Sequence, residues 1–132
     1  MDPDLNNGRI LIVDDDQNIL EVLSRMIDSF GLEPISCTDV PSAVATYRSY
    51  KENKKTIAAV IMDLTIPGGV GGQEAVKLIL DCDPNAKVIV SSGYSDDPVT
   101  SDYARYGFAG VLPKPYDIDT LSKVLQDAMN RS

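Results

Sequence analysis

The sequence predicts an α/β protein in which a parallel sheet of five strands carries helices on both faces. Short apolar runs alternate with segments of helical periodicity about five times, at roughly 25 residues per unit. Five such units are too few for a barrel of eight, so we expect an open, doubly wound sheet. The length of 132 residues suits a single domain. We assign residues 1–8 to a polar tail and residues 9–130 to this domain.

Each expected strand is a short apolar run that ends at polar or turn residues. The expected strands cover residues 9–13, 33–37, 57–62, 86–90 and 108–112. The apolar run of the third strand is continuous, which is typical of a strand buried on both faces.

The expected helices lie between these strands. The first carries apolar residues at helical spacing from Ile19 to Phe30, and Gly31 is typical of a helix C-terminus. Caps are expected at Asp39 for the second helix and at Asp117 for the last. The third helix covers about residues 73–81. A fourth helix begins at Asp97-Pro98 and ends at Gly107.

Composition excludes several classes of function. The net charge of −8 argues against direct nucleic-acid binding, which needs a positive surface. No apolar run approaches the roughly 20 residues of a membrane span, and residues 1–8 contain no signal-peptide core, so we expect a cytoplasmic domain without membrane contact. We expect Cys37 and Cys82 to be reduced core residues. The chain has no histidine, so carboxylates, hydroxyls, lysine and a hard metal must carry any chemistry.

Polar residues follow four of the five expected strands. Asp14 and Asp15 follow the first, Asp63 the third, Ser92 the fourth and Lys114 the fifth. Parallel strands all end at one edge of a sheet, so these groups share that edge. Carboxylates about 5 Å apart repel by roughly 3 kcal/mol per pair, and a set of oxygen ligands suits Mg²⁺.

Helix capping is the simpler explanation for an acidic residue at the end of the first strand, and we accept it for Asp16. Asp63 differs because a carboxylate oxygen can attack phosphorus and form an acyl phosphate. Phosphoryl transfer then requires positioning and neutralising charge, which Mg²⁺ and Lys114 would supply. Ser92 is a possible hydrogen-bond donor to the phosphoryl group, and the segment Gly68 to Gly72 is either a flexible turn or a phosphate-binding loop.

Four segments, ILIVDDD, VIMDLTIPGG, VIVSSG and LPKPY, occur in an order and at a spacing that resemble the receiver domains of two-component response regulators. The resemblance covers about residues 9–130. It implies a flavodoxin-like sheet of strand order 2-1-3-4-5 with five helices. It also implies a phosphorylation-operated signalling module, which acts catalytically only in its own phosphorylation and slow dephosphorylation.

The resemblance implies a role for each matching residue. Asp63 matches the phosphoacceptor, and the Mg²⁺ ligands are Asp14, Asp15, Asp63 and the backbone carbonyl of Thr65. Ser92, which Gly93 follows, matches the switch hydroxyl. The phosphate-contacting lysine of the family corresponds to Lys114.

The family also implies partners. The phosphodonor is a histidine on a kinase or phosphotransfer partner. A homodimer or an effector is expected to use the fourth helix, fifth strand and fifth helix. The segments SSGYSDDPV and GFAGVLPKPY especially resemble receivers of hybrid sensor kinases, so the chain is either a stand-alone receiver or a domain excised from such a kinase.

Two departures from the family pattern are notable. Val111 stands where the family often has an aromatic residue, which leaves the aromatic half of the switch in question, and the loop after Pro67 is one residue longer than usual. Thr65 and Tyr94 flank the expected approach of water, so a bulky Tyr94 is expected to slow hydrolysis.

Two other classes of protein compete with the receiver hypothesis. The first is a Mg²⁺-dependent phosphatase of the haloacid dehalogenase type with Asp14 as nucleophile, since Asp14-x-Asp16 fits its motif. It leaves Asp63 without a role. The second is a nucleotide or flavin-binding module, in which three aspartates after the first strand would face a phosphate.

Overall fold

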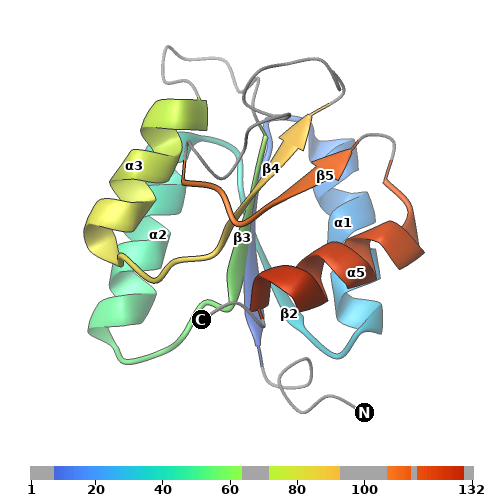
Figure 1. Cartoon of the computed structure of the whole chain (residues 1–132), viewed down its shortest axis with the longest axis horizontal. Helices are drawn as coiled ribbons and strands as arrows, with labels where there is room; N and C mark the ends of the chain where they lie inside the picture. Colours follow the sequence, from blue (N-terminus) through green and yellow to red (C-terminus); the bar gives the residue numbers. More distant parts are fainter. Residues whose placement is uncertain (1–7, 64–71, 93–106, 114–115, 130–132) are drawn as a thin grey trace.

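The computed structural model describes residues 8–63, 72–92, 107–113 and 116–129 (Figure 1). The elements in chain order are β1 (Arg9–Val13), α1 (Gln17–Ser29), β2 (Glu33–Cys37), α2 (Val40–Glu52), β3 (Ala59–Asp63), α3 (Gly72–Cys82), β4 (Val88–Ser92), β5 (Gly110–Pro113) and α5 (Ile118–Met129). The expected helix after Asp97 lies outside the described residues, as does almost all of the expected tail.

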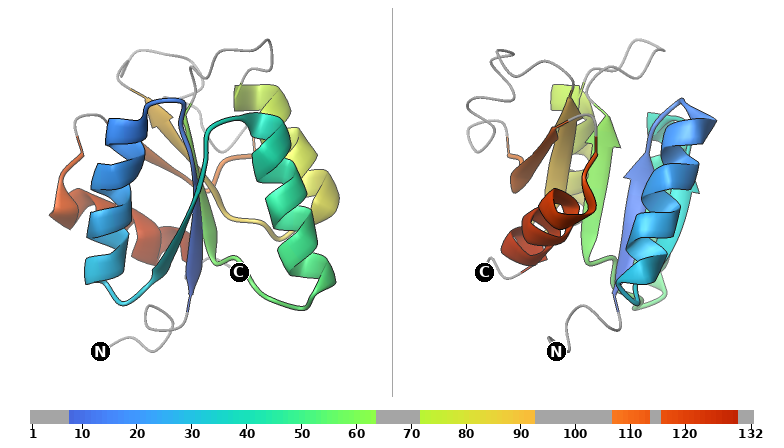
Figure 2. Two further views of the ribbon diagram at one scale, coloured as in Figure 1. Left: turned by 180° about the vertical axis from the view of Figure 1, so that it is seen from behind. Right: turned by 90° about the vertical axis from the view of Figure 1, so that its right-hand side faces the viewer.

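The strands form one five-stranded parallel sheet of order β2-β1-β3-β4-β5, which confirms the expected fold class. Helices α2 and α3 cover one face of this sheet, and α1 and α5 cover the other (Figures 1 and 2). We call these the α2/α3 face and the α1/α5 face.

Alternation along each strand divides the core between the two faces. Leu11 and Val13 of β1 pack with buried residues of α2 and α3. Ile10 and Ile12 pack with buried residues of α1 and α5. The same alternation holds in β3 and β4, so the central strands are apolar on both faces.

The predicted helix caps are present. The side chain of Asp16 accepts a hydrogen bond from the Asn18 N–H at the start of α1. The side chains of Asp39 and Asp117 likewise accept a hydrogen bond from a backbone N–H at the start of α2 and of α5. Gly31 follows the end of α1 and has a φ of 83°. These four local signals were therefore interpreted correctly from the sequence.

The predicted strand limits were less accurate. Strands β3, β4 and β5 each begin two residues later than expected, at Ala59, Val88 and Gly110. The reason is that Ile57 and Phe108 are buried but precede the hydrogen-bonded ladder, so the apolar run is longer than the strand. Helix α2 continues to Glu52.

Individual core predictions were mostly confirmed. Cys37 is buried, Cys82 is half-buried, and both are free thiols. Burial raises the pKa of the Cys37 thiol, as expected for an unreactive core cysteine. Ile118, the first residue of α5, is by contrast 43% exposed. None of the helices in the described ranges is long and apolar enough to cross a membrane.

A polar cluster ties α2 to the turn that leads into β4. The Tyr47 hydroxyl donates to Asp83 Oδ2 at 2.9 Å, and Lys51 Nζ lies 3.2 Å from Asp83 Oδ1. The Asn85 N–H also donates to Asp83 Oδ1. Burial opposes ionisation of Asp83, but the bonds from Asn85, Tyr47 and Lys51 together lower its pKa.

We expect Asp83→Asn to lower the free energy of unfolding at pH 7 by about 1 to 3 kcal/mol, because hydrogen bonds to a charged group are lost. The pKa of Asp83 is lower in the folded chain than in the unfolded one, so this stabilisation exists above the usual carboxyl range. It disappears as the pH falls through the acid range below about 4. Urea unfolding of both proteins between neutral and acid pH measures the difference. If the difference in the free energy of unfolding grew on acidification, the stabilising role of the ionised Asp83 carboxylate would be contradicted.

Candidate functional site

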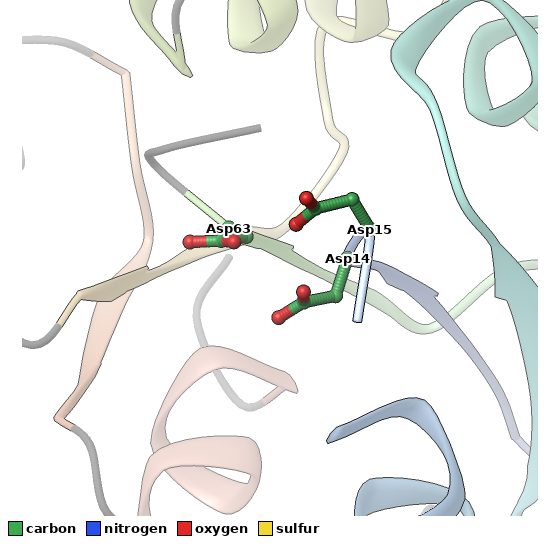
Figure 3. Close-up of side chains that lie close together, drawn as sticks. All are labelled: Asp14, Asp15 and Asp63. Atoms are coloured by element: carbon green, nitrogen blue, oxygen red, sulfur yellow. The ribbon is translucent and has the colours of Figure 1, made fainter. Parts of the chain in front are cut away.

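Three carboxylates gather at one edge of the sheet, as the sequence predicted. Oxygen atoms of Asp14, Asp15 and Asp63 all lie within 4.8 Å of one another. Asp14 and Asp15 extend from the end of β1 toward Asp63 at the end of β3 (Figure 3). Asp14 and Asp63 are 2% and 4% exposed, whereas Asp15 is exposed to solvent.

The backbone holds these carboxylates in place. The pairing of Val13 with Met62 aligns the ends of β1 and β3, so the residues that follow are neighbours. The Asp14 N–H donates to the Cys37 carbonyl, which prolongs the β1–β2 ladder by one residue. The Asp14 side chain accepts from the Asp16 N–H at 2.9 Å, which orients its carboxylate.

The donor set fits a hard divalent cation. Three carboxylates this close repel one another by about 3 kcal/mol per pair at an effective dielectric constant of about 20. Two of them are almost fully shielded from water, so solvent alone relieves little of this repulsion. Oxygen ligands with one exposed carboxylate suit Mg²⁺, which keeps several waters in its shell. Asp14, Asp15 and Asp63 are the residues that would hold it.

Ser91 is an additional polar residue near the carboxylates that sequence reasoning did not identify. Ser91 is 1% exposed and is the register partner of Asp63 in the β3–β4 ladder. Its hydroxyl is hydrogen-bonded to the hydroxyl of Tyr116. Alternation in VIVSS was the available signal, because it places Ser91 on the same face as Ile89.

Other predicted site residues fall outside the description. The structure describes the backbone of Ser92 as the last residue of β4, opposite Pro113, but not its side chain. Thr65, Tyr94 and Lys114 lie outside the described residues. Their assigned roles therefore stay predictions. Asp16 is at the N-cap of α1, as the capping interpretation expected.

Known proteins share both this sequence pattern and this fold. Residues 10–126 match the family model of the response regulator receiver domain. The chemotaxis protein CheY of Thermotoga maritima is 32% identical over 120 residues, which are 88% of this chain and 96% of that protein. The DNA-binding transcriptional regulator NtrC of Escherichia coli is 30% identical over 127 residues, which are 96% of this chain and 26% of that protein.

A solved structure with a similar fold is the CheX-CheY-BeF3-Mg²⁺ complex from Borrelia burgdorferi. Its TM-score is 0.83 at 26% identity, and the match covers 94% of this chain and 90% of that one. This chain spans nearly the whole of one curated relative and about a quarter of another.

The chain belongs to the response regulator receiver domain family. It is a phosphoacceptor signalling domain of two-component systems, and the carboxylate edge is where the family resemblance puts its site. The alternative of a haloacid dehalogenase-type phosphatase is not supported, since the family match covers most of the chain and Asp16 caps a helix.

The exposed carboxylate provides a test of the cation site. In metal-free buffer we expect Asp15→Asn to raise the free energy of unfolding by about 0.5 to 1 kcal/mol. One repulsive charge is removed, and because Asp15 is exposed, solvent already screens most of its repulsion. The same change weakens Mg²⁺ binding by roughly 3- to 10-fold, because an oxygen ligand charge is lost. Thermal unfolding with EDTA and with increasing Mg²⁺ measures both effects.

Asp81→Asn is the matched control, because it changes the net charge equally from an exposed position on α3. It should leave the Mg²⁺ dependence of unfolding unchanged. Equal behaviour of the two variants would mean that the stabilisation by Mg²⁺ is a general charge effect.

Proposed function

We propose that Asp63 accepts a phosphoryl group from a phosphohistidine of a histidine kinase or phosphotransfer protein. The observation that carries this proposal is the buried Asp63 carboxylate at the end of β3, grouped with Asp14 and Asp15. The proposed Mg²⁺ ligands are these three carboxylates and the backbone carbonyl of Thr65. Support also comes from the Borrelia burgdorferi CheY relative, whose structure is described with BeF3 and Mg²⁺.

The transfer is a displacement at phosphorus. An oxygen of Asp63 forms the new P–O bond, the P–N bond to the histidine breaks, and the histidine nitrogen keeps that electron pair. Bound Mg²⁺ supplies positive charge that offsets the charge of the phosphoryl oxygens. Lys114 is proposed to contact the phosphate and Ser92 to be the switch hydroxyl. The burial of Asp63 limits the access of water to its carboxylate.

The product is a signal rather than a metabolite. A phosphoryl group changes the charge at Asp63, and such a change can favour one of two arrangements of a nearby surface. We propose that this surface includes the expected fourth helix with β5 and α5, and that it binds an effector or a second copy of the domain. Dephosphorylation would be slow and self-catalysed. We place the domain in the cytoplasm, where ATP maintains phosphohistidine donors.

Incubation with Mg²⁺ and acetyl phosphate tests the assignment. We expect the intact mass to rise by one phosphoryl group, the label to map to Asp63 after borohydride trapping, and Asp63→Asn to remain unlabelled. EDTA should prevent labelling of the native chain, since the oxygens of Asp14, Asp15 and Asp63 converge on one cation site. Label on Asp14 with rapid turnover would instead support the phosphatase.

A second prediction concerns the lifetime of the phosphorylated state. If the Tyr94 side chain hinders the approach of water, Tyr94→Ala will hydrolyse its aspartyl phosphate several-fold faster, on the order of 3- to 10-fold. The decay of labelled protein after removal of the donor measures this rate. Tyr50→Ala, which alters a residue of α2 outside the carboxylate edge, serves as control. An unchanged rate for Tyr94→Ala would refute the role.

A further inference from the structure

The hydroxyl pair of Ser91 and Tyr116 lies beside the carboxylate site on the α1/α5 face. Ser91 is held by two ladders, because it pairs with Asp63 of β3 on one side and with Leu112 of β5 on the other. Its hydroxyl is hydrogen-bonded to that of Tyr116, and Ser91 itself is only 1% exposed. The position of the Tyr116 hydroxyl is therefore set by the same strands that set Asp63.

Tyr116 is close enough to the carboxylates to respond to their charge. Its ring packs against the buried cluster of the α1/α5 face. Burial raises the pKa of Tyr116 to about 12, with the negative charges of Asp14 and Asp63 acting in the same direction and the Ser91 bond opposing them. The phenol therefore stays protonated and neutral at physiological pH, as a hydrogen-bonding group beside two carboxylates.

This contact is separate from the position where the family often has an aromatic residue. Val111 packs against the buried cluster of the α2/α3 face. Tyr116 packs on the opposite face of the sheet. A signal that passes through Tyr116 would reach a different helix surface from one that passes through position 111.

Tyr116 is also joined directly to the start of α5. The next residue, Asp117, caps this helix, because its side chain accepts hydrogen bonds from the Thr120 N–H and hydroxyl, each at 3.1 Å. The Leu121 N–H donates to the Asp117 carbonyl at 2.9 Å. A shift of Tyr116 therefore displaces the capping residue and with it the first turn of α5.

We propose that Tyr116 is a positioning residue of the phosphorylation site, and that its hydrogen bond with Ser91 connects the charge at Asp63 to the start of α5. Two hydroxyls share one hydrogen bond, so their second proton orients in the field of the nearby carboxylates. A phosphoryl group and a cation change that field, and hence the preferred arrangement of the pair. The inference rests on the proposed role of Asp63.

The test compares Tyr116→Phe, Ser91→Ala and the double variant with the native chain. Backbone amide shifts of α5 are recorded by NMR before and after adding Mg²⁺ with beryllofluoride, a phosphoryl mimic. We expect each single variant to reduce the response of the first two turns of α5 by about twofold or more, with no further reduction in the double variant. Ligand-induced shifts at Asp63 itself should persist.

Tyr47→Phe is the matched control. It removes a tyrosine hydroxyl that also makes a partly buried hydrogen bond, but to Asp83 in the turn before β4, at the other end of that strand. It should lower stability and leave the α5 response at the native level. Thermal unfolding establishes that each variant is folded, and if one single variant unfolds, the other carries the comparison.

A native response in Tyr116→Phe would overturn the proposal. So would a loss in Tyr116→Phe without a loss in Ser91→Ala, because ring packing rather than the hydrogen bond would then be responsible. Unfolding of both variants would also overturn it, since the bond would be a requirement of the fold. A native chain that takes no label on Asp63 contradicts the proposed function instead, which separates the two failures.

Discussion

The crowding of three carboxylates at one sheet edge is the constraint on which the rest of the site depends. Parallel pairing of β1 with β3 forces the residues after these strands together, whatever their charge. The repulsion costs a few kcal/mol. The core offsets it, because each fully buried residue such as Ile10, Leu11 or Ile61 contributes about 1.5 to 3 kcal/mol. The fold thus tolerates an edge whose mutual repulsion a bound cation would reduce.

Strand alternation decides which helices adjoin that edge. Asp14, Asp63 and Ser91 continue the series Ile12, Ile61 and Ile89, whose side chains pack on the α1/α5 face. A shift of one residue in register would move these groups to the α2/α3 face. The chemistry of the site and the position of α5 are therefore coupled through the register of the ladders rather than through a contact that any one residue makes alone.

Local signals allowed much of this to be predicted from the sequence. Caps at Asp39 and Asp117 and the carboxylates at the strand ends were assigned correctly, because each depends on a few neighbouring residues. Strand order was taken from the family resemblance, since periodicity shows that a strand is buried but not which strand lies beside it. The contact between Ser91 and Tyr116 could not be predicted for a related reason. Only the register among β3, β4 and β5 shows that Ser91 adjoins Tyr116.

Two tyrosines show how environment separates a structural contact from a responsive one. The Tyr47 hydroxyl donates to Asp83, whose charge is already matched by Lys51, so this cluster has one stable arrangement. Burial and the Asp83 carboxylate raise the pKa of Tyr47, which keeps its phenol a donor. The Tyr116 hydroxyl meets a neutral serine instead, and either oxygen can donate. The nearby carboxylates of Asp14 and Asp63 belong to the proposed cation and phosphorylation site. A tyrosine side chain therefore anchors one end of the sheet at Tyr47, and at the other end Tyr116 can respond to chemistry.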